Sequence, residues 1–162
     1  MTSPKAQPIL IPPSAGQSLP VLGSDITVKL NSAQTAGSAY VFESVSPPGA
    51  GVPPHVHERE DELLTVLEGE VEILLAGNRS TASAGVVASF PRGVPHAFTT
   101  TGERPARILW VVTPGENFEK FFHDASKLPS DAPPDLERIV AISSRYGITM
   151  LVGSSVASTR VA

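Results

Sequence analysis

Cysteine is absent from the 162 residues of this sequence. The absence excludes disulfide bonds, thiolate metal ligands and cysteine nucleophiles, so any metal site must use nitrogen and oxygen donors. Aromatic residues make up only 6% of the chain, whereas proline occurs 16 times and glycine 13 times. This composition favours many short strands and turns over long helices, and the length suits one domain with a single core.

Runs of basic residues and long apolar runs are also missing. The chain has 12 Lys and Arg against 16 Asp and Glu, a formal net charge of -4. Without a basic cluster, we expect neither a nucleic acid nor a membrane as a partner. No stretch approaches the roughly 18 apolar residues of a membrane span, and the proline-rich start lacks the apolar core of a signal peptide. We therefore predict a soluble, cytoplasmic protein.

The pattern of breakers divides the chain into an arm, a strand-rich region and two later segments. Residues 1–24 are rich in Pro, Ser and Gly without periodicity, which predicts an extended N-terminal arm or a strand that needs a partner. Residues 25–115 alternate short apolar segments with turn-forming residues, which predicts a β domain. The expected strands are Ile26–Leu30, Ala39–Val45, Val52–His57, Leu63–Leu67, Val71–Ala76, Val86–Phe90, His96–Thr101 and Ala106–Thr113.

A helical period follows this region. Glu116–Lys127 places its apolar residues three and four positions apart after a Pro-Gly breaker, and Pro134–Tyr146 begins with proline and acidic residues. The apolar faces expected to be buried are Phe118, Phe121, Phe122 and Ala125 in the first helix, and Leu136, Ile139, Val140 and Ile142 in the second. We expect a C-terminal helical extension over 116–152 and a flexible tail over 153–162.

The histidines are the strongest candidates for metal ligands. His55 and His57 lie two apart in an expected strand, so their imidazoles point to the same face. Taken alone, this pair is more often an exposed strand face. His96 follows a turn that contains two prolines and a glycine and would begin a new strand. His123 lies on the polar side of the first expected helix, so we predict that it is solvated.

The carboxylates near these histidines differ in their expected surroundings. Glu62 shares strand parity with Leu64 and Val66, so it is expected to face the core. A buried carboxylate is costly unless it is paired or coordinates a cation. The acids that precede it are predicted to form a solvated turn: Glu58, Glu60 and Asp61. Glu62 is therefore the one carboxylate of this stretch that is singled out for chemistry.

These spaced residues resemble the two motifs of the cupin superfamily. Gly49, five residues, His55-Val56-His57, four residues, Glu62, six residues and Gly69 match the first motif. Gly85, five residues, Pro91, one residue, Gly93, two residues and His96 match the second. The one departure is Thr100, where the family usually has Asn. The resemblance covers residues 38–115 and implies an all-β fold, a cupin jelly-roll β-barrel within 25–115, followed by one or two C-terminal helices.

The resemblance further implies that His55, His57, Glu62 and His96 bind one divalent transition metal inside the barrel. Three imidazoles and a carboxylate suit Fe, Mn, Ni, Co, Cu or Zn, and such a site leaves open positions for a small-molecule substrate, water or dioxygen. Apolar residues predicted to wall the pocket, each of which also suits an ordinary barrel core, are Leu64, Val66, Leu74, Phe90, Phe98, Ile108 and Trp110.

Within the superfamily, the segments PPHVHEREDE, VLEGEVE and PRGVPHAF look like the small single-domain cupins grouped with quercetin dioxygenase. This likeness implies a metal-dependent dioxygenase acting on a flavonol-like or other enolisable aromatic molecule, with Glu62 as both ligand and catalytic base. Because fold does not determine function, two alternatives stay open: a metal-dependent isomerase, cyclase or hydrolase, and a non-catalytic small-molecule-binding cupin. Small cupins are commonly dimers, which implies a homodimer.

Overall fold

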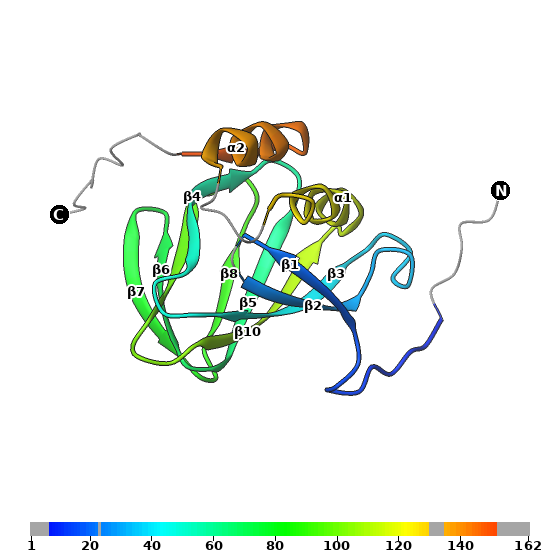
Figure 1. Ribbon diagram of the computed structural model, residues 1–162, viewed down its shortest axis with the longest axis horizontal. Helices are drawn as coiled ribbons and strands as arrows, with labels where there is room; N and C mark the ends of the chain where they lie inside the picture. The colour runs from blue at the N-terminus through cyan, green and yellow to red at the C-terminus, as the bar shows by residue number, and fades with distance from the viewer. Residues whose placement is uncertain (1–6, 23, 130–134, 152–162) are drawn as a thin grey trace.

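The computed structural model of the chain describes residues 7–22, 24–129 and 135–151. Within these residues the strands form two antiparallel sheets that face each other (Figure 1). The six-stranded sheet has the order β1 (Gln17–Val21), β2 (Ser24–Leu30), β3 (Tyr40–Ser46), β10 (Ala106–Thr113), β5 (Asp61–Glu68) and β8 (Val87–Phe90). The five-stranded sheet has the order β11 (Ile148–Met150), β4 (Gly51–His57), β9 (His96–Thr101), β6 (Glu70–Leu75) and β7 (Asn78–Ser83).

Strand alternation builds the core between the two sheets. In β10 every second side chain is buried, from Ala106 to Val112, while the intervening ones are only partly covered. Leu64 and Val66 of β5 are 0% and 1% exposed, as their parity with Glu62 predicts. The period of two thus directs one face of each central strand inward. This arrangement confirms the predicted all-β jelly roll.

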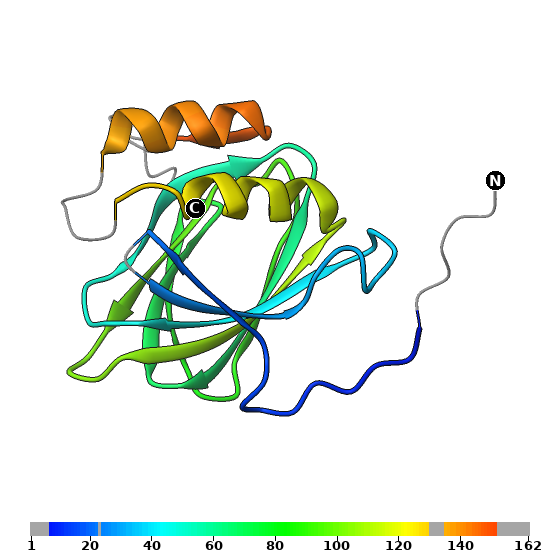
Figure 2. The same cartoon turned by 45° about the vertical axis from the view of Figure 1, so that its right-hand side comes forward.

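Two helices cover one end of the barrel, α1 (Glu116–Ala125) and α2 (Leu136–Arg145) (Figure 2). The four apolar residues expected on the first helix are all buried, and the Phe122 ring packs against Tyr40 and Phe42 of β3. Asp135 begins α2 by accepting the backbone N–H of Arg138 at 3.1 Å. The predicted helical extension is present, although its first helix ends at Ala125 and not at Lys127.

Several details of the sequence prediction are corrected. Leu136 is 55% exposed, because the buried face of α2 is formed by Ile139, Ile142 and Ser143. Strand β7 was not expected, since five of its six side chains are exposed and only Ala82 is buried. Also unpredicted is β11, whereas β1 is a strand of the kind that the prediction for residues 1–24 allowed, with its partner β2 in the same chain.

Some predictions fall outside what the structure describes. The tail over 153–162 and Pro134, the expected start of the second helix, lie beyond the described residues. Neither helix in the described ranges has the length and apolar character that a membrane crossing needs. The cytoplasmic location and the homodimer stay predictions.

Candidate metal centre

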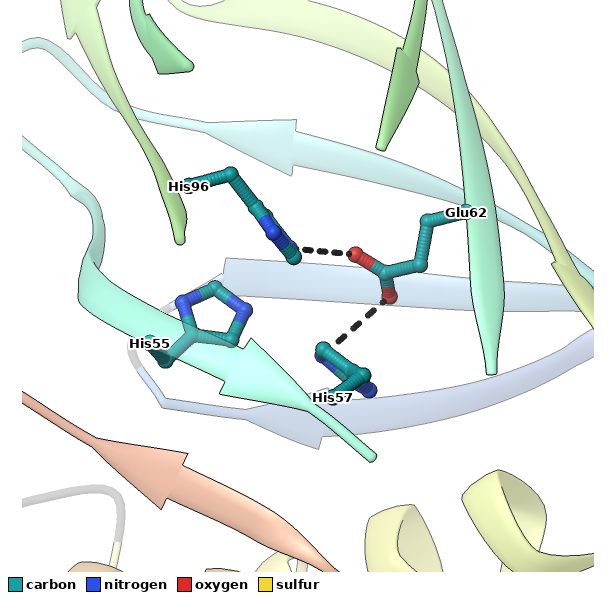
Figure 3. Close-up of side chains that lie close together, drawn as sticks. All are labelled: His55, His57, Glu62 and His96. Carbon is teal, nitrogen blue, oxygen red and sulfur yellow. Dashed lines mark hydrogen bonds and ion pairs between the residues drawn. The ribbon is translucent and has the colours of Figure 1, made fainter. Parts of the chain in front are cut away.

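Four side chains converge inside the barrel (Figure 3). They are His55 and His57 of β4, Glu62 of β5 and His96 of β9. We call them the four-residue cluster. Their ligand atoms all lie within 4.8 Å of one another, and all four residues are buried. The structure therefore brings together the complete set of predicted ligands from both sheets, although they are separated by up to 41 positions, the difference between residues 55 and 96.

Local backbone geometry aims these side chains inward. In the antiparallel pair of β4 and β9, His55 lies opposite His96, so the two rings are neighbours with centroids 4.3 Å apart. Gly51, at the start of β4, allows the strands to approach closely, because a Cβ there would lie 2.1 Å from the Phe98 carbonyl oxygen. Gly93, at φ +77°, forms the turn before β9 and donates its N–H to the His57 carbonyl at 2.7 Å. The turn and β4 thus hold each other in place.

Each imidazole of the cluster has its Nδ1 facing an oxygen acceptor. His55 Nδ1 lies 2.8 Å from the Pro53 carbonyl oxygen, and His96 Nδ1 lies 2.9 Å from the Val94 carbonyl oxygen. His57 Nδ1 lies 3.3 Å from Glu60 Oε2. Since an acceptor at Nδ1 favours the tautomer with its proton there, Nε2 is the nitrogen of each ring that can offer a lone pair to a metal. Metal-binding histidines have this arrangement almost without exception.

Glu62 lies between two of these rings. Its Oε2 is 3.1 Å from His96 Nε2 and its Oε1 is 3.7 Å from His57 Nε2 (Figure 3). Burial raises the pKa of Glu62, but the imidazoles of His57, His96 and His55 outweigh it and lower the pKa to about 2. Glu62 is therefore ionised at neutral pH, which a metal ligand and a proton acceptor both require.

The pKa values of His55 and His57 are shifted in opposite directions. Burial, with the neighbouring imidazoles, lowers the pKa of His55 to about 4, so this ring is neutral at pH 7. Burial also opposes a charge on His57, but Glu62 and Glu60 raise the pKa of this ring. Without metal, the two carboxylates thus favour a proton on His57. A divalent cation would take over the role of that proton, so the donor set fits such an ion.

The predicted solvated turn before Glu62 is wrong at one residue. Glu58 is exposed, and Asp61 is partly exposed and paired with Arg92 at 2.8 Å. Glu60 is instead 0% exposed, with its carboxylate between His57 and Asn117 of α1. A buried carboxylate in a short acidic turn gives no periodic signal, and its partner Asn117 lies 57 positions later. His123, by contrast, is exposed as predicted.

A mostly apolar cavity of about 80 Å³ borders the cluster. This volume exceeds the roughly 10–15 Å³ that one water needs, so the cavity can hold several waters or part of a ligand. Of the predicted wall residues, Phe90, Phe98 and Trp110 line it, whereas Leu64, Val66 and Ile108 belong to the core and Leu74 to a separate groove. Four aromatic side chains from α1 and β3 also line the cavity, which the sequence pattern did not predict: Phe42, Phe118, Phe121 and Phe122.

Comparison with known families identifies this architecture. Residues 42–112 match the family model described as Cupin domain. The barrel has the cupin fold. The matched segment contains the entire four-residue cluster, and the match supports the membership of the cupin superfamily that the two motifs predict.

Curated relatives match over similar short segments. Germin-like protein subfamily 2 member 2 of Arabidopsis thaliana is 40% identical over 67 residues, which cover 38% of this chain and 31% of that protein. Quercetin 2,3-dioxygenase of Bacillus subtilis is 31% identical over 64 residues, 40% of this chain and 19% of that protein. The HTH-type transcriptional regulator PuuR of Escherichia coli is 32% identical over 76 residues, 47% of this chain and 40% of that protein. The chain spans less than half the length of each of these relatives.

Solved structures support the fold over a larger share of the chain. A predicted oxalate decarboxylase from Thermotoga maritima superimposes with a TM-score of 0.61 at 22% identity, covering 65% of this chain and 98% of that one. The polyketide cyclase RemF from Streptomyces resistomycificus gives a TM-score of 0.56 at 24% identity, covering 67% and 80%. At these identities the likeness concerns the fold alone, because one fold hosts many chemistries.

Proposed function

We propose that the four-residue cluster holds one divalent transition-metal ion and that the protein acts as a dioxygenase on an enolisable aromatic small molecule. The orientation of the three imidazoles carries the metal assignment, since each ring has an oxygen acceptor at Nδ1, which leaves Nε2 as its metal-binding nitrogen. Barrel residues that merely filled a core would not need this shared arrangement. Fe, Mn, Ni, Co, Cu and Zn all suit the donor set.

The cavity supports an aromatic substrate. Rings from both sheets and from α1 line it, and Ser143 of α2 borders it with a buried hydroxyl that has no hydrogen-bond partner among the residues that the structure describes. None of the lining residues in the described ranges is Lys or Arg, so the cavity offers no basic side chain of these types to a phosphate group. A planar molecule with adjacent hydroxyl and keto oxygens would place its apolar body against the rings and its oxygens toward the cluster.

Glu62 has the properties of a proton acceptor in this reaction. It is ionised at neutral pH and buried beside the space where a substrate oxygen would lie. A hydroxyl within hydrogen-bond reach would transfer its proton to Glu62 as the enolate forms, and burial keeps bulk water from competing. A bound divalent metal would stabilise the enolate oxygen and, if redox-active, would allow reaction with dioxygen.

Similarity to quercetin 2,3-dioxygenase supports the oxidative function, and similarity to PuuR favours a second candidate. In that candidate the same cavity binds a small molecule without converting it, as a sensor would. Both candidates use the same cluster and the same aromatic walls. Turnover therefore distinguishes them, whereas binding does not.

The decisive experiment is anaerobic reconstitution with each of the six metals, followed by oxygen-uptake measurements with flavonols, catechols and diketones. Oxygen uptake with product formation supports the dioxygenase. Turnover without oxygen uptake would replace it with Lewis-acid chemistry. Binding without turnover, detected through the fluorescence of Trp110, the chain's one tryptophan and a cavity residue, would favour the sensor.

The metal assignment has its own control. Wild-type protein and the His96→Ala variant are compared by elemental analysis after the same reconstitution. We expect about one metal ion per chain in the wild type and a large loss in the variant. Stoichiometric metal that the substitution leaves unchanged would contradict the four-ligand assignment.

A further inference from the structure

Glu60 is a completely buried carboxylate that the proposed reaction does not use. It lies in the turn between β4 and β5, a position where a side chain could easily reach solvent. Both of its oxygens are engaged instead. Oε2 lies 3.3 Å from His57 Nδ1, and Oε1 accepts a hydrogen bond from Asn117 Nδ2 at 2.6 Å. Since burial of a carboxylate is costly without such partners, these two contacts are what keep Glu60 inside.

Asn117 is itself held from a second side. Its Nδ2 also donates to the Tyr146 carbonyl oxygen at 2.8 Å, at the end of α2. Asn117 belongs to the first turn of α1, so one amide group joins the β4–β5 turn to both helices. The position of Glu60 is thereby set by contacts far apart in sequence and not by the turn alone.

The three imidazoles of the cluster differ in the kind of acceptor that faces Nδ1. His55 and His96 use backbone carbonyl oxygens two residues away, which the strand and turn geometry supplies. His57 alone uses a side chain, and that side chain is a carboxylate. A carboxylate acceptor makes an imidazole a stronger electron donor than a carbonyl does, and it fixes both the tautomer and the rotation of the ring.

We propose that Glu60, anchored by Asn117, is a positioning residue that orients His57 for metal binding. It accepts the Nδ1–H of His57 and leaves the Nε2 lone pair directed at the centre of the cluster. The inference rests on the proposed metal site. It adds a carboxylate outside the four ligands and a connection from the site to the two helices that wall the cavity.

The test compares Glu60→Gln with Glu58→Gln. Both variants remove one negative charge from the same turn, but the Glu58 side chain is exposed whereas Glu60 is buried. An amide at position 60 replaces one of the two acceptor oxygens with an NH2 donor, which would face either His57 Nδ1–H or the Asn117 amide and lose that contact. We expect Glu60→Gln to bind Co²⁺ and Ni²⁺ about 10–100-fold more weakly than the wild type, measured by competition with a chromophoric chelator. Glu58→Gln should stay within about twofold.

Two further readouts separate positioning from a general loss of structure. Circular dichroism and thermal melting of the metal-free variants establish that each one folds. In ¹⁵N NMR of the imidazoles, metal-free wild-type protein should show His57 with its Nδ1 protonated and hydrogen-bonded, and Glu60→Gln should change the His57 signals more than those of His55. Asn117→Ala leaves the carboxylate in place but frees it, so this variant should also weaken metal binding. It supplies the test if Glu60→Gln does not fold.

The outcomes distinguish this inference from the proposed function. If the wild type binds metal and neither Glu60→Gln nor Asn117→Ala weakens binding beyond the Glu58→Gln control, the positioning role is overturned while the metal site stands. If the wild type binds neither Co²⁺ nor Ni²⁺, both proposals fail. Weaker binding in both variants together with the altered His57 signals supports the role.

Discussion

Replacement of Phe118 by alanine tests whether α1 is an integral part of the barrel. The ring is 4% exposed and lies at the centre of an aromatic group, with ring centroids 4.5 Å from Phe122, 5.9 Å from Phe42 and 5.7 Å from His57. A buried aromatic ring removes about 150–250 Å² from water. At about 25 cal/mol per Å², this burial contributes about 4–6 kcal/mol, an upper estimate because unfolded chains are partly compact.

Measured losses for buried Phe→Ala substitutions, about 3–5 kcal/mol, lead us to expect about 4 kcal/mol for Phe118→Ala. This is a large fraction of the roughly 5–15 kcal/mol that stabilises a typical domain. At about 2–4 °C per kcal/mol for a chain of this size, the melting temperature should fall by about 8–16 °C. Urea unfolding of the metal-free protein, followed by circular dichroism, gives the free energy directly.

The matched control is His123→Ala on the opposite face of the same helix. The His123 side chain is 72% exposed, so its replacement should change the free energy of unfolding by no more than about 0.5 kcal/mol. Both substitutions put alanine into α1, so a difference between them reports packing and not helix propensity. A loss below about 1 kcal/mol for Phe118→Ala, close to that of the control, would refute the packing of α1 against the barrel.

Three further predictions address the site and the helices. Metal at 100 times its dissociation constant should add about 2.7 kcal/mol to the free energy of unfolding of the wild type. Calorimetry should show that a chelator removes this gain and that His96→Ala does not gain stability when metal is added. Ser143→Ala should not destabilise the ligand-free protein, because within the described part of the chain the lost hydroxyl has no hydrogen-bond partner, and a loss above about 1 kcal/mol in urea unfolding would contradict this. The Tyr146 hydroxyl and Lys127 lower the pKa of Asp124 from its ordinary 3.8 to about 2, so its stabilising effect is complete above pH 3.8 and lost as pH falls toward 2. Melting curves of metal-free wild type and Asp124→Asn should therefore converge between pH 4 and 2, and a constant gap would count against the Asp124–Tyr146 contact.

The metal-ligand candidates could be predicted because each depends on a short-range pattern. His55 and His57 share a strand face, and the parity of Glu62 with Leu64 and Val66 places its side chain in the core. Burial on one face determines the register of a central strand, so the period of two identifies the inward side chains reliably. The convergence of the two sheets on one point came from the family resemblance, since a strand pattern alone does not say which strands face each other.

Contacts between distant segments account for what the sequence did not reveal. Glu60 was assigned to a solvated turn because its neighbours are acidic, yet its burial depends on Asn117, 57 positions away. Strands β7 and β11 lie at the edges of their sheet, where one side needs no partner and few side chains are buried. Such strands exist because a neighbour supplies backbone hydrogen bonds, and single-sequence periodicity does not report that neighbour.

The cavity residues divide into those inside and those outside the segment that matches the family model, and this division limits what the family match says about the substrate. The segment that matches the cupin family, residues 42–112, contains the four-residue cluster and the rings of Phe42, Phe90, Phe98 and Trp110. About half of the residues that line the cavity lie outside it, in β1, β2, α1, α2 and β11. Hydrogen-bonding and shape differences in a pocket wall decide between substrates more strongly than a shared metal does. The candidate metal ligands therefore lie in the segment that matches the family model, whereas much of the wall that a ligand would contact lies outside that segment.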